Sequence, residues 1–223
     1  MAPSYVLGSS FSLADLTNSQ RQHLDQAEWV FTCNSFLSHW QSAGFRPTVW
    51  TWGDNHSAEM VRQLDVELAA IADDARLQER LRFMFVGKEA FASEAQGRVR
   101  VRGVPGLFYR RGDPGTRNQI PATTLQQSIY HYGSTFTDLV NFAAILNPGQ
   151  PIYLYGNEWG DGFGHFWEGR ITERWPRIWP EVKRCMWQGL RDLQDSHGYE
   201  FVDCNRHLEP LPAEFQLPTG HFP

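Results

Sequence analysis

Short apolar runs recur through the first half of the chain, and each one stops at small or polar residues. The runs cover residues 5–7, 29–32, 48–52 and 83–86. Short apolar runs that end in turn-forming residues predict buried strands. Residues 58–82 instead carry apolar side chains at a spacing of about 3.6 residues, which predicts an amphipathic helix.

The second half of the chain repeats this alternation. The pattern predicts a helix at residues 139–146, a strand at 151–155, a helix at 178–193 and a strand at 199–203. Strands that alternate with helices indicate an α/β protein with a mostly parallel sheet and helices on both faces. We expect residues 1–223 to form a single domain of this kind.

Two segments carry more specific local expectations. Ser12 stands where it would cap a helix that carries Leu13 and Leu16. Residues 87–124 are richer in Gly, Pro and Arg, so we expect an irregular, lid-like excursion from the core.

Composition and charge narrow the class of protein. The 223 residues are 41% hydrophobic, which provides enough apolar material for one substantial core. The net charge of −5 is mild and the basic residues are scattered, so we expect no nucleic-acid partner. No apolar run reaches the roughly 20 residues that span a bilayer, and no signal-peptide pattern is present, which favours a cytoplasmic location. Three cysteines without CxxC spacing favour reduced thiols over disulfides or a zinc site.

Polar clusters follow several of the predicted strands, where open α/β sheets bind their ligands. Gly8-Ser9-Ser10 would offer N–H groups and hydroxyls to a phosphate, and a plain structural turn is the alternative. Asn34 could read a base or a ribose, or instead form an Asx turn or a helix cap. Gly133-Ser134-Thr135 joins small residues to a helix start in the same way and makes a nucleotide more plausible than a lone anion.

The segment 156–165 is the richest in candidate chemistry. It contains Gly156, Asn157, Glu158, Asp161 and His165. Glycines let a backbone approach a ligand closely, and an imidazole can take a proton from a sugar hydroxyl, although a loop histidine can also be merely solvated. Among the nine tryptophans, Trp159 and Trp167 are candidates for stacking on a sugar ring, against the alternative of ordinary packing.

These motifs together resemble the bacterial CMP-sialic-acid-dependent sialyltransferases of glycosyltransferase family 42 and their motility-associated glycosyltransferase relatives. The family's opening strand, Gly-Asn-Gly-Pro-Ser-Leu-like turn and short helix are similar to Val6-Leu7-Gly8-Ser9-Ser10-Phe11-Ser12-Leu13. Its Cys-Asn pair is matched by Cys33-Asn34, and its Asn-containing loop by Gly53-Asp54-Asn55-His56. Its Ile-Tyr-Leu-x-Gly-x-Asp strand is matched by Ile152-Tyr153-Leu154-Tyr155-Gly156-Asn157-Glu158, with Glu in place of Asp.

The resemblance implies a single Rossmann-like domain of the GT-A-variant type. It implies inverting, metal-independent transfer of a sialic-acid-like sugar from a CMP-activated donor to a glycan hydroxyl, with His165 as general base. The donor would contact the first turn, Asn34, Asn55 and the Ser134-Thr135 turn, with Glu158 near its ribose or base. Its phosphate would contact three residues farther along the chain, namely Tyr130, Tyr132 and Arg117. The CMP-sugar is a substrate, so no cofactor is implied.

Several alternatives stay open at this stage. One is a non-catalytic module of the same fold that binds a nucleotide or a glycan. Another is a small esterase-like hydrolase that uses Ser57, and a third is a transferase for a different nonulosonic acid or Kdo. The implied partners are a nucleotide sugar and a glycan acceptor. A homo-oligomer, and peripheral attachment to the inner face of a membrane through residues 170–187, are further options.

Overall fold

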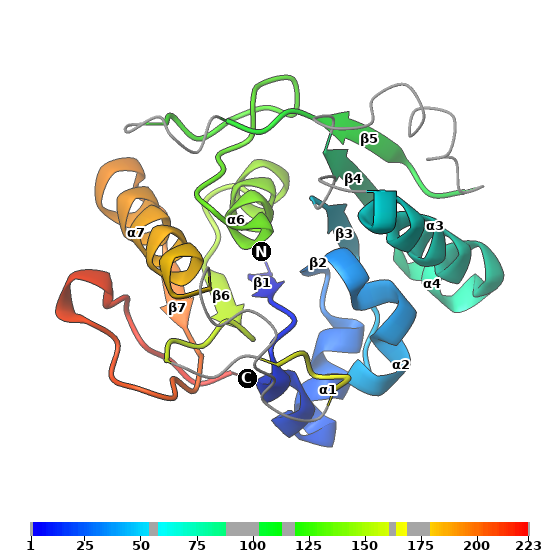
Figure 1. Ribbon diagram of the computed structural model, residues 1–223, viewed down its shortest axis with the longest axis horizontal. Helices are drawn as coiled ribbons and strands as arrows, with labels where there is room; N and C mark the ends of the chain where they lie inside the picture. The colour runs from blue at the N-terminus through cyan, green and yellow to red at the C-terminus, as the bar shows by residue number, and fades with distance from the viewer. Residues whose placement is uncertain are drawn as a thin grey trace.

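The computed structural model describes residues 2–53, 58–87, 103–112, 119–160, 164–168 and 179–222. At its centre lies a seven-stranded sheet in the order β5-β4-β3-β2-β1-β6-β7, with every neighbouring pair parallel (Figure 1). The strands are β1 (Ser4–Leu7), β2 (Trp29–Cys33), β3 (Val49–Trp52), β4 (Phe83–Gly87), β5 (Gly106–Tyr109), β6 (Ile152–Tyr155) and β7 (Phe201–Asp203). The predicted open α/β fold with a parallel sheet is confirmed.

Helices cover both faces of the sheet. The α-helices are α1 (Asn18–Gln26), α2 (Trp40–Ala43), α3 (Ala58–Asp73), α4 (Ala75–Arg80), α6 (Thr135–Leu146) and α7 (Trp179–His197), and the 3-10 helices are η1 (Phe11–Asp15), η2 (Asn34–His39) and η3 (Ala213–Phe215). Figure 1 shows α1 to α4 on one side of the sheet and α6 and α7 on the other.

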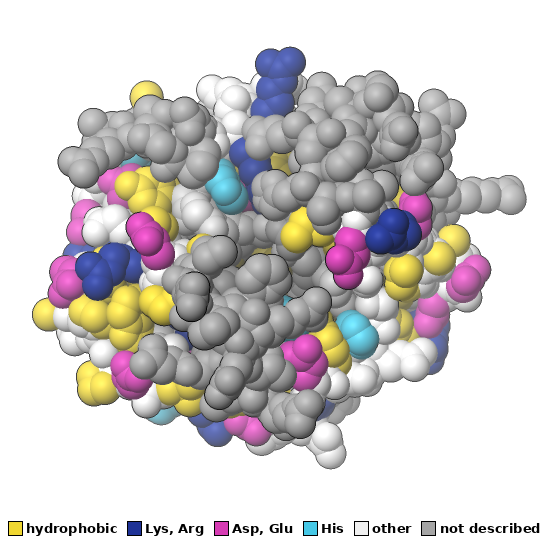
Figure 2. Space-filling view, viewed as in Figure 1, with side chains coloured by type: hydrophobic (Ala, Val, Ile, Leu, Met, Phe, Trp, Pro, Cys, Tyr) yellow, Lys and Arg dark blue, Asp and Glu magenta, His cyan; other side chains and the backbone are white. Residues whose placement is uncertain are grey.

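Successive residues of each strand point to opposite faces of the sheet and pack into two separate hydrophobic cores. Leu7, Trp50 and Met84 belong to the core under α1 to α4, whereas Val6 and Phe85 belong to the core under α6 and α7. All five side chains are almost completely buried, as expected for parallel strands that are covered on both faces. On the outer face seen in Figure 2, acidic and basic side chains of the described residues are interspersed.

The strand order places a topological switch point between β1 and β6. The chain builds β1 to β5 in one direction and then returns through α6 to add β6 and β7 on the other side of β1. The two central strands pair in register, with Val6 opposite Leu154 and Leu7 opposite Tyr155. Their connections leave in opposite directions at the carboxyl ends, which is the place where open α/β sheets generally form the crevice that binds a ligand.

Ser12 does not cap a helix, so this expectation was wrong. It lies buried inside η1, and its hydroxyl donates to Glu158 Oε1. The regular helix α1 begins later, with Thr17 as its N-cap: the Thr17 side chain accepts from the Gln20 backbone N–H, and the Gln20 side chain accepts from the Thr17 N–H. The reciprocal pair is a capping box, which is a stronger start signal than an isolated serine.

The predicted helix over residues 58–82 is two helices, α3 and α4. Asp74 separates them in an extended conformation, and its carboxylate accepts from the Arg76 backbone N–H to cap α4. The apolar period continues through the break because both helices pack on the same core, so the pattern alone does not reveal it.

The expected irregular excursion over residues 87–124 contains a strand. β5 pairs in parallel with β4 and forms the edge of the sheet, with Val86 opposite Phe108 and Gly87 opposite Tyr109. Its apolar run, Leu107-Phe108-Tyr109, is as short as that of β1 and lies in a segment rich in Gly, Pro and Arg, and three of its four residues are partly or largely exposed. The remaining expectation for this segment falls largely outside the described residues.

The switch point depends on the absence of a side chain at Gly8. A Cβ built on Gly8 would lie 2.1 Å from the Gly156 carbonyl oxygen, a backbone atom that cannot rotate away. We expect Gly8→Ala to lower the free energy of unfolding by about 3 kcal/mol or more, because it forces β1 and β6 apart. Urea denaturation followed by circular dichroism would measure the loss.

The matched control is Gly149→Asn. Gly149 has a φ of +70° but no neighbour within 4 Å of its Cβ position, and Asn tolerates this backbone conformation. Its free energy of unfolding should change by less than about 1 kcal/mol. Equal losses in both variants would show that the close backbone contact does not limit stability.

Candidate functional site

The turn after β1 and the turn after β6 are joined backbone to backbone. The Gly8 N–H donates to the Tyr155 carbonyl at 2.8 Å, and the Ser10 N–H donates to the Gly156 carbonyl at 3.1 Å. Gly156 has a φ of +76°, which lets the chain turn away immediately after β6. The structure thus brings Gly8, Ser9, Ser10 and Gly156 together at the switch point.

His165 returns to the same place from farther along the chain. Ser10 and His165 form an antiparallel bridge, and the Phe166 N–H donates to the Ser9 carbonyl at 3.1 Å. The His165 Nδ1 lies 3.1 Å from the Ser9 hydroxyl, and the ring stacks on Trp167 with centroids 4.2 Å apart. The imidazole is therefore held beside the first turn by both backbone and side-chain contacts.

Glu158 lies beneath this turn. Its side chain is 2% exposed, and Oε1 accepts from the Ser12 hydroxyl. Burial raises the pKa of Glu158, while a hydrogen bond from Ser10 and the charge of Lys183 lower it to a smaller extent. Its other oxygen, Oε2, is buried and has no hydrogen-bond partner among the described residues. Glu158 therefore supports the turn from below and is not at the surface of the crevice.

The segment after β6 is also anchored from the β7 side. Asp203 accepts from both the Asn205 side-chain amide and His207 Nε2, at 2.8 and 2.9 Å. In turn, Asn205 Oδ1 accepts from the Asn157 N–H and His207 Nδ1 accepts from the Trp159 N–H. These bonds place the His207 ring proton on Nε2. One buried carboxylate thus fixes, through Asn205 and His207, the backbone donors of Asn157 and Trp159.

Asn34 holds the ends of β2 and β3 together. Its side-chain oxygen accepts from the Gly53 N–H at 3.1 Å, and its carbonyl accepts from the Trp50 indole N–H at 2.8 Å. Its φ is +50°, in the left-handed region that Asn tolerates better than most residues. The structural alternative to base reading therefore has direct support at this position.

The N-terminus of α6 is tied to the end of β3 by Arg111. The guanidinium donates to the Gly53 carbonyl at 2.7 Å, to the Thr135 hydroxyl at 2.8 Å and to Asp138 at 2.7 Å. Ser134 caps the helix, because its side chain accepts from the Phe136 N–H. The predicted turn at Ser134 and Thr135 is thus a helix N-terminus at the carboxyl edge of the sheet.

Asp138 is fully buried and collects three donors. Besides Arg111, it accepts from the Tyr109 hydroxyl at 2.6 Å and lies 2.7 Å from His131 Nδ1. Burial, together with the Asp138 charge, raises the pKa of Tyr109 well above its ordinary value. The network joins β5, the stretch before α6 and α6 itself, so it sets where the helix N-terminus lies.

The remaining predicted residues are not brought to the crevice or cannot be placed. Tyr130 is 1% exposed and donates to the Gly189 carbonyl and to Asp192, both on α7. Tyr132 stacks on Tyr130 and also packs at Gly189. The predicted Asn55, Asp161, Arg117 and Ser57 lie outside the described residues.

Sequence reasoning missed Asp138, Arg111 and Lys183. A usable signal existed for Asp138, which is the one charged residue in α6 (TFTDLVNFAAIL). A lone charge in an apolar helix has to be paired on burial. Arg111 and Lys183 gave no such signal, because each has charged or polar neighbours along the sequence.

Comparisons with known proteins returned no match: no protein-family model, no curated protein and no solved structure is similar to this chain. Within the described ranges, no group of three or more His, Cys, Asp or Glu side chains could hold a metal ion. No helix in the part of the chain that the structure describes is long and apolar enough to cross a membrane. Cys33, Cys185 and Cys204 do not form disulfides with one another.

The two contributions of Asn34 can be separated by substitution. We expect Asn34→Ala to lower the free energy of unfolding by about 2–3 kcal/mol, because it loses the bond to Gly53 and because Ala tolerates positive φ less well than Asn. Asn34→Gly keeps the backbone conformation and should lose only about 1 kcal/mol. Urea titrations of both variants would test this ordering, and equal losses would show that φ is not a constraint here.

The raised pKa of Glu158 predicts a pH-dependent stability. Above the ordinary carboxyl value of 4.5, the unfolded chain releases this proton before the native protein does, so the native state binds more protons and stability falls as pH rises. Glu158→Gln cannot ionise, so its stability relative to wild type should increase as pH rises through that window. Urea unfolding at a series of pH values measures the difference.

Glu59→Gln is the matched control for this experiment. Glu59 is exposed in the first turn of α3, so its replacement should give no comparable trend with pH. A difference between Glu158→Gln and wild type that stays flat with pH would contradict the assignment of a raised pKa.

Proposed function

We propose that this protein is a glycosyltransferase that moves a sialic-acid-like sugar from a CMP-activated donor to a glycan hydroxyl, with inversion and without a metal. The observation that carries the proposal is the pairing of Ser9 and His165 at the β1/β6 switch point. A proton acceptor is needed beside the ligand crevice for this chemistry, and segments far apart in the sequence meet there.

The donor phosphate is assigned to the first turn and to the N-terminus of α6. Helix N-termini present backbone N–H groups and a partial positive charge that favour anions. Ser9, Ser10, Ser134 and Thr135 place hydroxyl groups at these two places, and the Ser10 hydroxyl is also hydrogen-bonded to Glu158. In this proposal Asn34 positions the end of β3, and Tyr130 and Tyr132 support α6 and α7 in place of contacting the phosphate.

His165 acts as the general base in this proposal. The proposal assigns the ring proton to Nδ1, which lies 3.1 Å from the Ser9 hydroxyl, so that Nε2 carries the lone pair and takes the proton of the acceptor hydroxyl. The acceptor oxygen then forms a bond to the anomeric carbon as the bond from that carbon to the phosphate oxygen breaks. CMP leaves with the bonding electrons, and the configuration is inverted. Glu158, buried under the turn, keeps Ser12 and η1 in position.

Nucleotide binding and turnover test separate parts of the proposal. We expect CMP, but not UDP, GDP or ADP, to raise the melting temperature, because a ligand that binds only the native state stabilises it. His165→Ala should keep this shift and lose CMP release from CMP-sialic acid in the presence of glycan acceptors by about 100-fold or more. The control is His221→Ala, an exposed histidine in the C-terminal segment.

The outcomes separate the remaining candidates. No shift with any nucleotide would contradict the transferase, and a CMP shift without turnover on any acceptor would favour a binding module. A hydrolase is the second candidate because a serine hydroxyl within 3.1 Å of an imidazole is also a nucleophile–base pair. Ester hydrolysis that disappears in Ser9→Ala would favour the hydrolase.

A further inference from the structure

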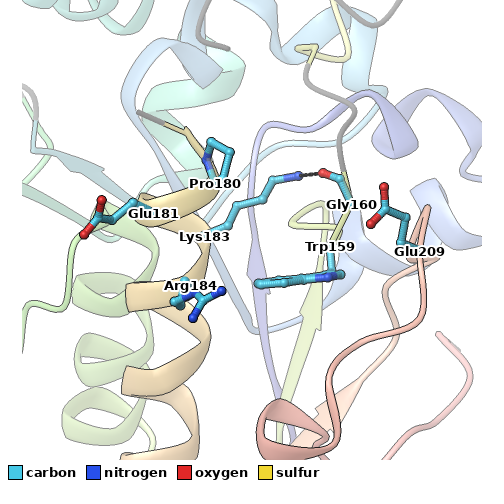
Figure 3. A pocket seen from close by; sticks show the side chains of 7 residues that line it. All are labelled: Trp159, Gly160, Pro180, Glu181, Lys183, Arg184 and Glu209. Carbon is cyan, nitrogen blue, oxygen red and sulfur yellow. Dashed lines mark hydrogen bonds between the residues drawn. The ribbon is translucent and has the colours of Figure 1, made fainter. Parts of the chain in front are cut away.

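A cavity of about 470 Å³ lies beside the segment that follows β6. Trp159 and Gly160 form one wall, the first turns of α7 form the second, and Glu209 contributes from the C-terminal segment (Figure 3). This volume lies within the roughly 300–1,000 Å³ typical of small-molecule sites. None of its lining residues belongs to the Ser9–His165 pair, so the cavity is a separate part of the surface next to the same segment.

Trp159 is a fixed aromatic wall of this cavity. Its backbone N–H donates to His207 at 2.9 Å, and its carbonyl accepts from the Leu208 N–H at 2.8 Å. The indole packs on Phe215 with centroids 5.4 Å apart, yet the residue stays partly exposed. A ring that is held in place before the ligand arrives costs little entropy on binding.

Lys183 fixes the neighbouring backbone. It is 6% exposed, and its ammonium donates to the Gly160 carbonyl at 2.8 Å. Figure 3 shows the indole ring edge-on, with the Lys183 side chain above it and Arg184 facing one end of the ring. The wall of the cavity is therefore tied to α7 on one side and to the C-terminal segment on the other.

The cavity is lined by charged side chains of both signs. Lys183 and Arg184 are cationic, whereas Glu181 and Glu209 are anionic, so the lining has no net charge. Guanidinium donors and carboxylate acceptors together suit vicinal hydroxyl groups, and the apolar indole face suits the C–H face of a pyranose. A strongly charged ligand would meet one repulsive pair of side chains for each attractive pair.

We propose that this cavity is the acceptor subsite and that it takes a neutral pyranose, stacked on Trp159 and held through its hydroxyls by Arg184 and Glu209. The assignment of the bound sugar as acceptor rests on the proposed function. The subsite is next to the donor crevice because the segment of residues 156–160 forms part of both: Gly156 contacts Gly8, and Trp159 lines the cavity.

The first test uses sugars without any nucleotide. Lactose, methyl α-glucoside, N-acetylglucosamine and glucuronic acid are titrated while saturation-transfer NMR reports contact and indole fluorescence reports affinity. We expect at least one neutral sugar to bind in the millimolar range and glucuronic acid to bind more weakly. Absence of binding by every neutral sugar, or preference for glucuronic acid, would overturn the proposal.

Variants of the cavity locate the binding. Trp159→Leu keeps an apolar contact with Phe215 but removes the flat face, and Arg184→Gln removes a donor fork from an exposed position where folding is not at risk. Each should weaken sugar binding by about tenfold. The matched controls are Trp29→Leu, half-buried at the start of β2, and Arg76→Gln, exposed on α4. Unchanged affinity in both cavity variants would overturn the proposal.

The response to CMP distinguishes this subsite from the donor site. Both cavity variants should keep the wild-type thermal shift with CMP, since the nucleotide is assigned to the first turn and α6. Sugar binding that persists while no nucleotide binds would leave the cavity as a sugar site and remove its acceptor role. A CMP shift that is lost in Arg184→Gln would assign the cavity to the donor and overturn the proposal.

Discussion

Two backbones meet without an intervening side chain where β1 and β6 end. The carbonyl of Gly156 occupies the space that a Cβ on Gly8 would need, and the N–H groups of Gly8 and Ser10 bond to the β6 side of the contact. This approach is what closes the sheet across its switch point. The contact also positions Ser9 and Ser10, and Ser10 in turn forms the bridge to His165.

Two buried carboxylates organise the crevice on either side of this contact. Asp138 draws Arg111, Tyr109 and His131 together on the β5 side, and Asp203 fixes the segment after β6 through Asn205 and His207. A buried charge is costly unless each of its oxygens is satisfied, so such a group tolerates only one arrangement of its donors. Asp138 and Asp203 therefore act by fixing positions: Asp138 fixes the N-terminus of α6, and Asp203 fixes the backbone N–H groups of the segment after β6.

The central strands and the main helices could be predicted from the sequence, since buried parallel strands and amphipathic helices have distinct periods. The polar residues at strand ends could be placed at one edge for the same reason, and Ser9, Ser10, Gly156 and His165 do come together there. The edge strand β5 was missed because its three apolar residues are surrounded by Gly, Pro and Arg residues, which are typical of an irregular segment. Arg111 and Lys183 escaped because their partners are backbone carbonyls and distant side chains, which no local pattern encodes.

Tyr130 is a residue for which the sequence suggested a ligand contact and the structure shows a packing role. From the sequence, a tyrosine that follows the irregular segment 87–124 could contact a ligand, yet its hydroxyl hydrogen-bonds to α7. Long-range packing decides between such readings, and it depends on where α7 lies against α6. Asn34 is similar, because its side-chain oxygen accepts from the Gly53 N–H, a contact that depends on the β2/β3 register.

The anchoring of the segment after β6 by Asp203, Asn205 and His207 also affects the order in which parts of the protein can fold during synthesis. A ribosome releases β1, the first turn and β6 well before it releases these three residues. During synthesis the sheet can therefore begin to assemble around β1 while the backbone N–H groups of Asn157 and Trp159 still lack their two side-chain acceptors. The ligand-facing geometry of the newly made protein is therefore completed late, together with β7 and with Phe215 and Leu217, the C-terminal residues of the core.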